Sequence, residues 1–176
     1  MKDFRIRSEK VSDIDAIHLL VARAFGREDE AKRVDKLRDQ GGLMFSLVAE
    51  ESRDQRLLGH LAFSMVNING DKQNWTALGL APVSVLPEFQ KQGIGSALIN
   101  FWFEHYSDPY FNAVVLLGSP DYYPRFGFKK AADFGLAWEF ECPEDAFQVR
   151  ELKQGFLGKA KGIVCYHPAF SECWFT

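Results

Sequence analysis

The residues best suited to chemistry in this sequence are a glutamine and two glycines, Gln90-x-x-Gly93-x-Gly95. They follow an apolar run typical of a buried strand, and apolar residues recur at helical spacing from Ile94 onward. The first N–H groups of a helix lack intrahelical partners and carry the positive end of the helix dipole. Glycines at such a junction let an anion approach the backbone, so the segment predicts a phosphate cradle.

The spacing excludes two common phosphate-binding loops. A P-loop has Gly-Lys-Ser/Thr at its end, whereas here Lys91 precedes the glycines and Ser96-Ala97 follows them. A dinucleotide fingerprint needs a small residue three positions after the second glycine, where this chain has Leu98. A glycine turn that binds nothing is the remaining alternative on this motif alone.

A second motif, Tyr123-Pro-Arg-Phe-Gly-Phe128, follows the first along the chain. Together the two resemble the GNAT (GCN5-related) N-acetyltransferases, whose patterns are Arg/Gln-x-x-Gly-x-Gly/Ala and Phe-Tyr-x-x-x-Gly-Phe. The resemblance covers nearly the whole chain, including a tail from Tyr166 to Phe170, and is closest to a branch of small bacterial predicted acetyltransferases. It implies an α/β (α+β) class and a GNAT-like acyl-CoA N-acyltransferase fold, with a central mixed, mostly antiparallel sheet flanked by helices.

The resemblance also implies acetyl-CoA as co-substrate and no metal. The backbone of Val83 and Val85 would pair with pantetheine as an added strand, and the amides from Lys91 to Ser96 would hold the pyrophosphate. Many family members have an Asn where this chain has Leu116, so that contact is not expected here. The expected cofactor-binding residues are Val83, Ser84, Val85, Gln90, Lys91, Gln92, Gly93, Ile94, Gly95 and Ser96.

For catalysis, the resemblance points to Tyr123 as the general acid. A phenol with an unperturbed pKa of ~10 is protonated at neutral pH and can protonate a leaving thiolate. A core aromatic role beside its phenylalanine neighbours is the alternative. The general base is not assigned by the sequence; the candidates are Glu50, Glu51, His60, Ser84 and an ordered water.

These residues need a scaffold, and the apolar patterns predict one. A helix capped by Ser12 and ending at Gly26 is expected, then a second helix and three consecutive antiparallel strands. A crossover through the helix after Gly93 implies a parallel strand pair. The expected segments are a strand at Phe4–Ile6, a helix at Glu28–Gln40, strands at Phe45–Glu51, Leu57–Ile68, Asn74–Val85 and Ala113–Leu117, and strand-like stretches at Phe128–Glu141 and Gly155–Tyr166.

Composition narrows the function classes. The 176 residues are 47% hydrophobic, which predicts one domain over residues 1–176 with a sizeable core. A net charge of -3 argues against a general nucleic-acid binder. Three cysteines without metal-ligand spacing predict free thiols, namely Cys142, Cys165 and Cys173. Neither a signal peptide nor a membrane span is visible, so a cytoplasmic protein is expected.

The expected activity is acetyl transfer from acetyl-CoA to a primary amine of a small molecule or peptide, by direct attack in a ternary complex. No nucleic-acid or membrane partner is expected. The alternative is a non-catalytic acyl-CoA-binding module that keeps the cradle without turnover. The C-terminal Trp174-Phe175 pair is compatible with packing on the protein's own core or with a homodimer.

Overall fold

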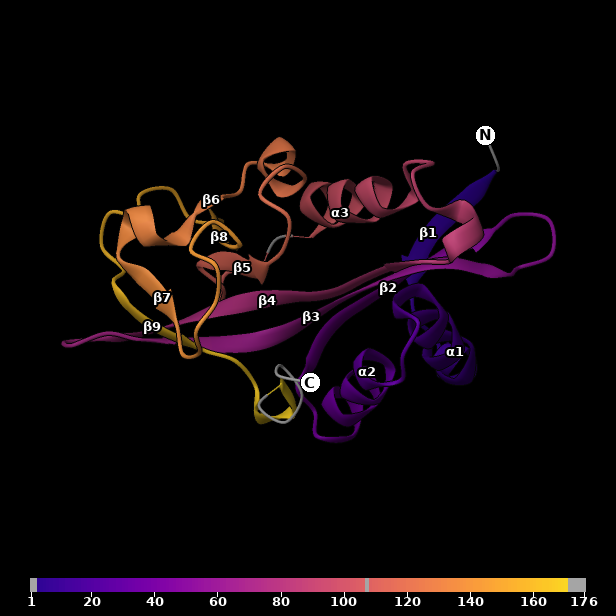
Figure 1. Cartoon of the computed structure of the whole chain (residues 1–176), viewed down its shortest axis with the longest axis horizontal. Coiled ribbons are helices and arrows are strands. Elements are labelled where there is room, and N and C mark those ends of the chain that lie inside the picture. The colour runs from indigo at the N-terminus through magenta and orange to yellow at the C-terminus, as the bar shows by residue number, and fades with distance from the viewer. Residues whose placement is uncertain (1–2, 107, 171–176) are drawn as a thin grey trace. The chain divides into compact units, whose positions relative to one another are not determined.

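The computed structural model describes residues 3–106 and 108–170, which form two compact units (Figure 1). The first unit comprises residues 3–63 and 82–106, and the second comprises residues 64–81 and 108–170. Two long strands, β3 (Leu57–Asn69) and β4 (Asn74–Val85), contribute to both units. The expectation of one domain over residues 1–176 stays a prediction.

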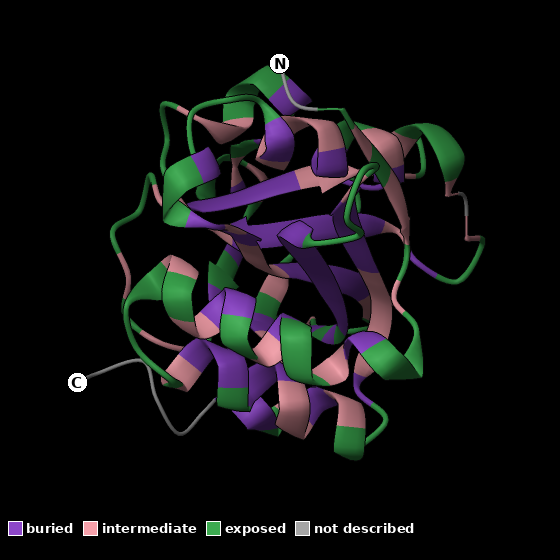
Figure 2. Cartoon of the chain, turned by 90° about the vertical axis from the view of Figure 1, so that its right-hand side faces the viewer, coloured by how far each residue is buried: buried purple, intermediate pink, exposed green. Residues whose placement is uncertain are grey.

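The first unit is a sheet with helices on both faces. Strand β1 (Phe4–Ser8) runs antiparallel to β2 (Leu43–Glu51), and β3 and β4 follow in the sheet order. Helices α1 (Ile14–Phe25) and α2 (Asp29–Asp39) lie on one face, and α3 (Ile94–His105) lies on the other (Figure 1). Figure 2 shows the strands mostly in the buried colour, while the helices alternate between buried and exposed positions.

Alternation along β3 explains how this sheet seats its helices. Gly59 faces α3, where an added Cβ would lie 2.9 Å from Ile94 Cγ2, so a side chain here would push the helix away. Phe63 faces the same helix and packs on Trp102, with ring centroids 4.2 Å apart. The intervening His60 belongs to the opposite face, on the side of α1 and α2. Gly59 and Phe63 therefore let α3 pack closely on this face of the sheet, both at its first turn and further along the helix.

The second unit extends β4 through a parallel pair. Strand β5 (Ala113–Leu117) pairs with β4 at Leu78↔Val114 and Gly79↔Val115, which confirms the predicted crossover. The remaining strands of the second unit are β6 (Lys129–Lys130), β7 (Leu136–Trp138), β8 (Phe147–Glu151) and β9 (Gly162–Cys165). Strand β8 runs antiparallel to β5 and to β6, while β9 pairs with β3 and with β7.

The expected elements after residue 128 were wrong in detail. The stretch Phe128–Glu141 is not one strand, because a 3₁₀ turn at Ala131–Phe134 and the left-handed Gly135 (φ +72°) separate β6 from β7. Within Gly155–Tyr166 only β9 is a strand. Strand β8 was not predicted, since its sequence Phe-Gln-Val-Arg-Glu is short and half polar.

The start of α1 and the cysteines were also predicted from the sequence. Ser12 does not cap α1, because a 3₁₀ turn at Val11–Asp13 precedes the helix and Asp13 occupies the cap position. Cys142 and Cys165 are free and half-buried. Cys173 and Trp174-Phe175 lie outside the described residues.

No helix within residues 3–106 and 108–170 is long and apolar enough to cross a membrane. No group of three or more His, Cys, Asp or Glu side chains in these same residues could hold a metal ion.

Candidate active site

The predicted cradle is a loop with two left-handed residues. Lys91 has φ +60° and Gly93 has φ +88°, and such a value is uncommon for a residue with a side chain. Amide groups in a turn of this kind point toward one side and form a concave anion site. An added Cβ at Gly93 would meet no atom within 4 Å, so the space above this glycine is open.

Helix α3 begins directly behind this loop. Its first backbone bond runs from the Ala97 N–H to the Gly93 carbonyl at 2.9 Å. The amides of Ile94, Gly95 and Ser96 precede that bond and have no helical carbonyl to reach. Because Ile94 is buried, it fixes the first turn against the sheet and leaves the amide end of the helix facing the loop. The loop and the helix start therefore lie next to each other, and phosphate binding there stays a prediction.

The glutamine side chains shape this loop. Gln90 Nε2 donates to the Val85 carbonyl at 3.1 Å, and Gln92 Nε2 donates to the Glu88 carbonyl at 3.0 Å. Gln90 therefore ties the loop to the end of β4. In this structure the side chains of both glutamines bind backbone carbonyls of the same segment. A contact of either residue with the cofactor would therefore come from its backbone N–H group.

The end of β4 has an open edge next to the loop. In the described residues, β5 pairs with β4 at Leu78 and Gly79 only, so β4 continues beyond its parallel partner through Val83–Val85. Val83 and Val85 are half-buried and Ser84 is buried. A strand edge of this kind can accept an extended ligand through main-chain hydrogen bonds. All ten predicted cofactor residues thus lie in one continuous stretch of the first unit.

Tyr123 lies in the second unit, in a 3₁₀ turn at Tyr123–Phe126 that follows β5. Its ring packs edge-on to Phe128, with centroids 5.9 Å apart, and covers the bare face of Gly118. Burial raises the pKa of Tyr123 to about 12, so the hydroxyl keeps its proton at neutral pH. The role of Tyr123 as general acid stays a prediction.

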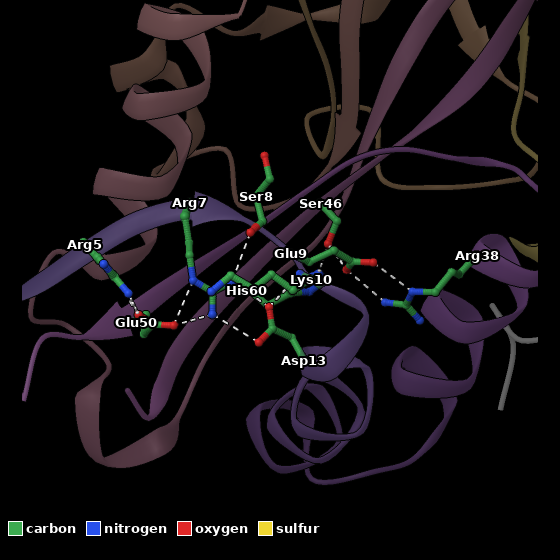
Figure 3. A network of polar contacts seen from close by, with 10 residues as sticks. All are labelled: Arg5, Arg7, Ser8, Glu9, Lys10, Asp13, Arg38, Ser46, Glu50 and His60. Carbon is green, nitrogen blue, oxygen red and sulfur yellow. Dashed lines mark hydrogen bonds and ion pairs between the residues drawn. The ribbon is translucent and has the colours of Figure 1, made fainter. Parts of the chain in front are cut away.

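The structure separates the candidate bases. Glu50 has a side chain only 2% exposed and accepts hydrogen bonds from Arg5 and Arg7, of which the Arg7 bond is the main cause of its lowered pKa (Figure 3). A carboxylate held in this way serves the fold. Glu51 ends β2 opposite Phe4.

His60 differs from these carboxylates because it is fully buried and Ser46 Oγ lies 2.8 Å from its Nε2. Sequence reasoning missed Ser46 and the Glu9 carboxylate beside it. Neither has a local signal, because they meet only through the pairing of β1 with β2.

With this geometry established, comparisons with known proteins place the chain in a family. Residues 5–131 match the sequence profile described as the acetyltransferase (GNAT) domain. The chain is also 36% identical over 167 residues to a protein described as the uncharacterized N-acetyltransferase YhbS of Escherichia coli strain K12. That alignment covers 95% of this chain and 98% of YhbS.

Solved structures agree with this placement. The crystal structure of Escherichia coli YhbS in complex with CoA superposes with a TM-score of 0.88 at 34% identity, covering 97% of this chain and 93% of the other. A GNAT family acetyltransferase from Brucella melitensis in complex with acetyl-CoA gives a TM-score of 0.76 at 36% identity, covering 97% and 99%.

The chain belongs to the GNAT acetyltransferase family. This assignment confirms the predicted fold and the predicted enzyme class, an acyltransferase of the GNAT type. The predicted co-substrate agrees with the CoA and acetyl-CoA bound by the two solved relatives. The individual site residues and the acceptor stay predictions.

Proposed function

We propose that this protein transfers an acetyl group from acetyl-CoA to a primary amine of a small-molecule or peptide acceptor by direct attack in a ternary complex. One observation carries the proposal: the open edge of β4 at Val83–Val85 is joined by a single 3₁₀ turn, Pro87–Phe89, to the left-handed loop at Lys91 and Gly93. An extended amide-containing arm and a pyrophosphate are the two parts of CoA that such an arrangement would bind. CoA and acetyl-CoA in the two solved relatives support this assignment.

In this proposal the chain's own residues divide the work. The amides from Lys91 to Ser96 hold the pyrophosphate, and the backbone of Val83 and Val85 aligns pantetheine. As the amine nitrogen bonds to the acetyl carbon, the carbon–sulfur bond breaks and Tyr123 gives its proton to the sulfur. Burial keeps that proton on the phenol at neutral pH, and the phenol gives it up only when negative charge develops on the sulfur.

The first test is calorimetric titration with acetyl-CoA. We expect the wild type to bind and Gly93→Glu to lose binding, because its carboxylate would occupy the open space and repel the pyrophosphate. Gly26→Glu is a matched control: Gly26 ends α1 with φ +70° and also has no atom within 4 Å of an added Cβ. The control should bear the same backbone strain and still bind acetyl-CoA. Absence of binding to folded wild-type protein would overturn the proposal.

The second test is CoA release with a panel of primary amines, followed as free thiol and checked by mass spectrometry of the acetylated product. Tyr123→Phe should lower kcat by about 10²–10⁴. Binding of acetyl-CoA without release by any amine would support the alternative, a non-catalytic acyl-CoA-binding module.

A further inference from the structure

Four neighbouring strands of the first unit each bring one polar side chain to the same row. The row consists of Glu9 just after β1, Ser46 on β2, His60 on β3 and Ser84 on β4. The Glu9 N–H donates to the Ser46 carbonyl at 3.0 Å, which continues the β1–β2 pairing. Figure 3 shows the first three members lying side by side.

Two contacts determine the pairing register of β3 and β4 near His60. The Leu86 N–H donates to the Leu58 carbonyl at 3.0 Å, and the Cβ position of Gly59 lies 3.1 Å from the Ser84 carbonyl oxygen. Counting two residues along each antiparallel strand from Leu58 and Leu86 makes His60 the partner of Ser84. Paired residues put their side chains on the same face of a sheet, with Cβ atoms about 5 Å apart.

The hydrogen bonds at the outer end determine where the protons lie. Arg38 donates to both oxygens of Glu9, at 2.9 and 3.0 Å, and Ser46 Oγ–H also donates to Glu9. Burial favours a higher pKa for Glu9, but the Arg38 and Ser46 hydrogen bonds outweigh it and hold the pKa below its ordinary value. Glu9 is therefore an ionised acceptor. Since Ser46 gives its single proton to Glu9, it accepts from His60, which must carry its proton on Nε2.

This tautomer leaves the other ring nitrogen as a bare acceptor. His60 has no exposed surface, and Nδ1 has no hydrogen-bond partner among the described residues. Ser84 is 1% exposed, and its Oγ likewise has no partner in that part of the chain. His60 Nδ1 and Ser84 Oγ do not hydrogen-bond to each other in this structure. Buried polar groups are nearly always satisfied, so an unsatisfied acceptor and an unsatisfied donor on paired residues call for an explanation.

Ser84 also lies between the two residues whose backbone is expected to align pantetheine. We propose that Ser84 and His60 are the base of the acetyl transfer: Ser84 takes the proton that the acceptor amine loses, and passes its own hydroxyl proton to His60 Nδ1. This inference rests on the proposed function and supplies the group that the sequence left open.

The step balances as follows. The nitrogen–carbon bond forms and the carbon–sulfur bond breaks, the amine proton moves to Ser84 Oγ, and the former Ser84 proton resides on His60 Nδ1. Tyr123 protonates the thiolate. Glu9 stabilises the resulting imidazolium through Ser46. After the products leave, His60 loses its extra proton to water and Tyr123 regains its proton from water.

Burial and the charges around His60 determine its pKa. Burial is the largest influence and lowers its pKa to about 4; Glu9 and Asp35 oppose this effect, while Arg38 adds to it. His60 is therefore unprotonated throughout the physiological range. It should hold a proton only while the reaction proceeds.

The test uses two variants and a matched control in the full-length protein. His60→Gln keeps an N–H donor for Ser46 but has no nitrogen that accepts a proton, and Ser84→Ala removes the hydroxyl. Ser64→Ala is the control, because Ser64 lies on β3 like His60, has no exposed surface and has no Oγ partner among the described residues. We expect His60→Gln to lower kcat by about 10²–10³ with unchanged affinity for acetyl-CoA, Ser84→Ala to lower kcat by the same amount, and Ser64→Ala to be neutral.

The pH profile separates a proton-transfer role from a structural one. Loss of the base should make the residual kcat of His60→Gln rise with pH up to the pKa of the amine, whereas a structural defect would lower kcat equally at every pH. Equal activity of all three variants and the wild type would overturn the inference while leaving the proposed function intact. A wild type that binds acetyl-CoA but acetylates no amine would refute both.

A second measurement does not depend on turnover. Nitrogen-15 NMR of the histidine rings should show His60 protonated at Nε2 and bare at Nδ1 between pH 5 and pH 8. Ser46→Ala should shift the Nε2 signal. The opposite tautomer would overturn the inference even if His60→Gln failed to fold.

Discussion

Adding one methyl group at Gly118 should move the predicted general acid. An added Cβ at this position would lie 2.3 Å from Tyr123 Cε2, whereas ordinary contact begins at 3.4 Å. The ring of Tyr123 must therefore move by about 1 Å, because the Cβ belongs to the strand-end backbone and cannot retreat far. Overpacking of this size costs about 1–3 kcal/mol of stability, and a catalytic group misplaced by about 1 Å loses about 10² in rate.

We expect Gly118→Ala to lower kcat for CoA release about 100-fold and to leave the calorimetric affinity for acetyl-CoA unchanged. The double variant Gly118→Ala/Tyr123→Phe is the decisive comparison. If the methyl group acts by displacing the hydroxyl, it should cost little once that hydroxyl is gone, so the two effects should be far from additive.

Gly158→Ala is the control for a glycine in the same unit. Its nearest neighbour to an added Cβ is the Gly155 carbonyl oxygen at 3.6 Å, which is ordinary contact. It should keep wild-type kcat. A Gly118→Ala variant with unchanged kcat, or one whose loss simply adds to that of Tyr123→Phe, would refute the reasoning.

Three further predictions concern stability, measured by urea unfolding. Glu50→Gln should cost about 1–3 kcal/mol, because it removes the buried carboxylate that accepts from Arg5 and Arg7 while Asp13 still pairs with Arg7; no measurable loss would contradict that account. His60 has a folded pKa of about 4 against an ordinary 6.5, so its contribution is complete above pH 6.5 and is lost as the pH falls toward 4. His60→Gln should therefore flatten the fall in stability between pH 6.5 and pH 4, and an unchanged slope would show that His60 is not the cause. Gly79→Ala should cost about 1–3 kcal/mol, since its Cβ would lie 2.6 Å from Tyr166 Cε1; a neutral result would mean that the tyrosine ring gives way freely.

The sequence predicted the first unit well because its signals are local. The helix that ends at Gly26, the helix that begins after Gly93 and the strand that ends at Val85 each have periodicity on one side and a glycine or proline on the other. Such signals act within a few residues, so they survive without knowledge of the fold. The end of the chain lacks them: β8 and β9 are held by partners distant in sequence.

The same distinction between local and distant signals decides which parts of the candidate site could be predicted. The glycine loop could be predicted because its chemistry depends on consecutive residues. The environment of His60 could not, because Glu9 and Ser46 reach it from other strands through hydrogen bonds that no spacing in the sequence encodes. The left-handed Lys91 was also beyond reach, since a lysine gives no hint of that conformation.

The packing of α3 provides an optical reporter of the cradle. Trp102 lies two turns behind the helix start and is 2% exposed. Its ring packs at a tilt of 34° on Phe63, with Phe45 edge-on at 5.5 Å. A helix of twelve residues moves nearly as a rigid rod, so a shift of its first turn toward a bound anion also displaces the indole against these rings. Ligand occupancy should therefore be readable from tryptophan emission without any label, and the signal would come from a chromophore that never touches the ligand.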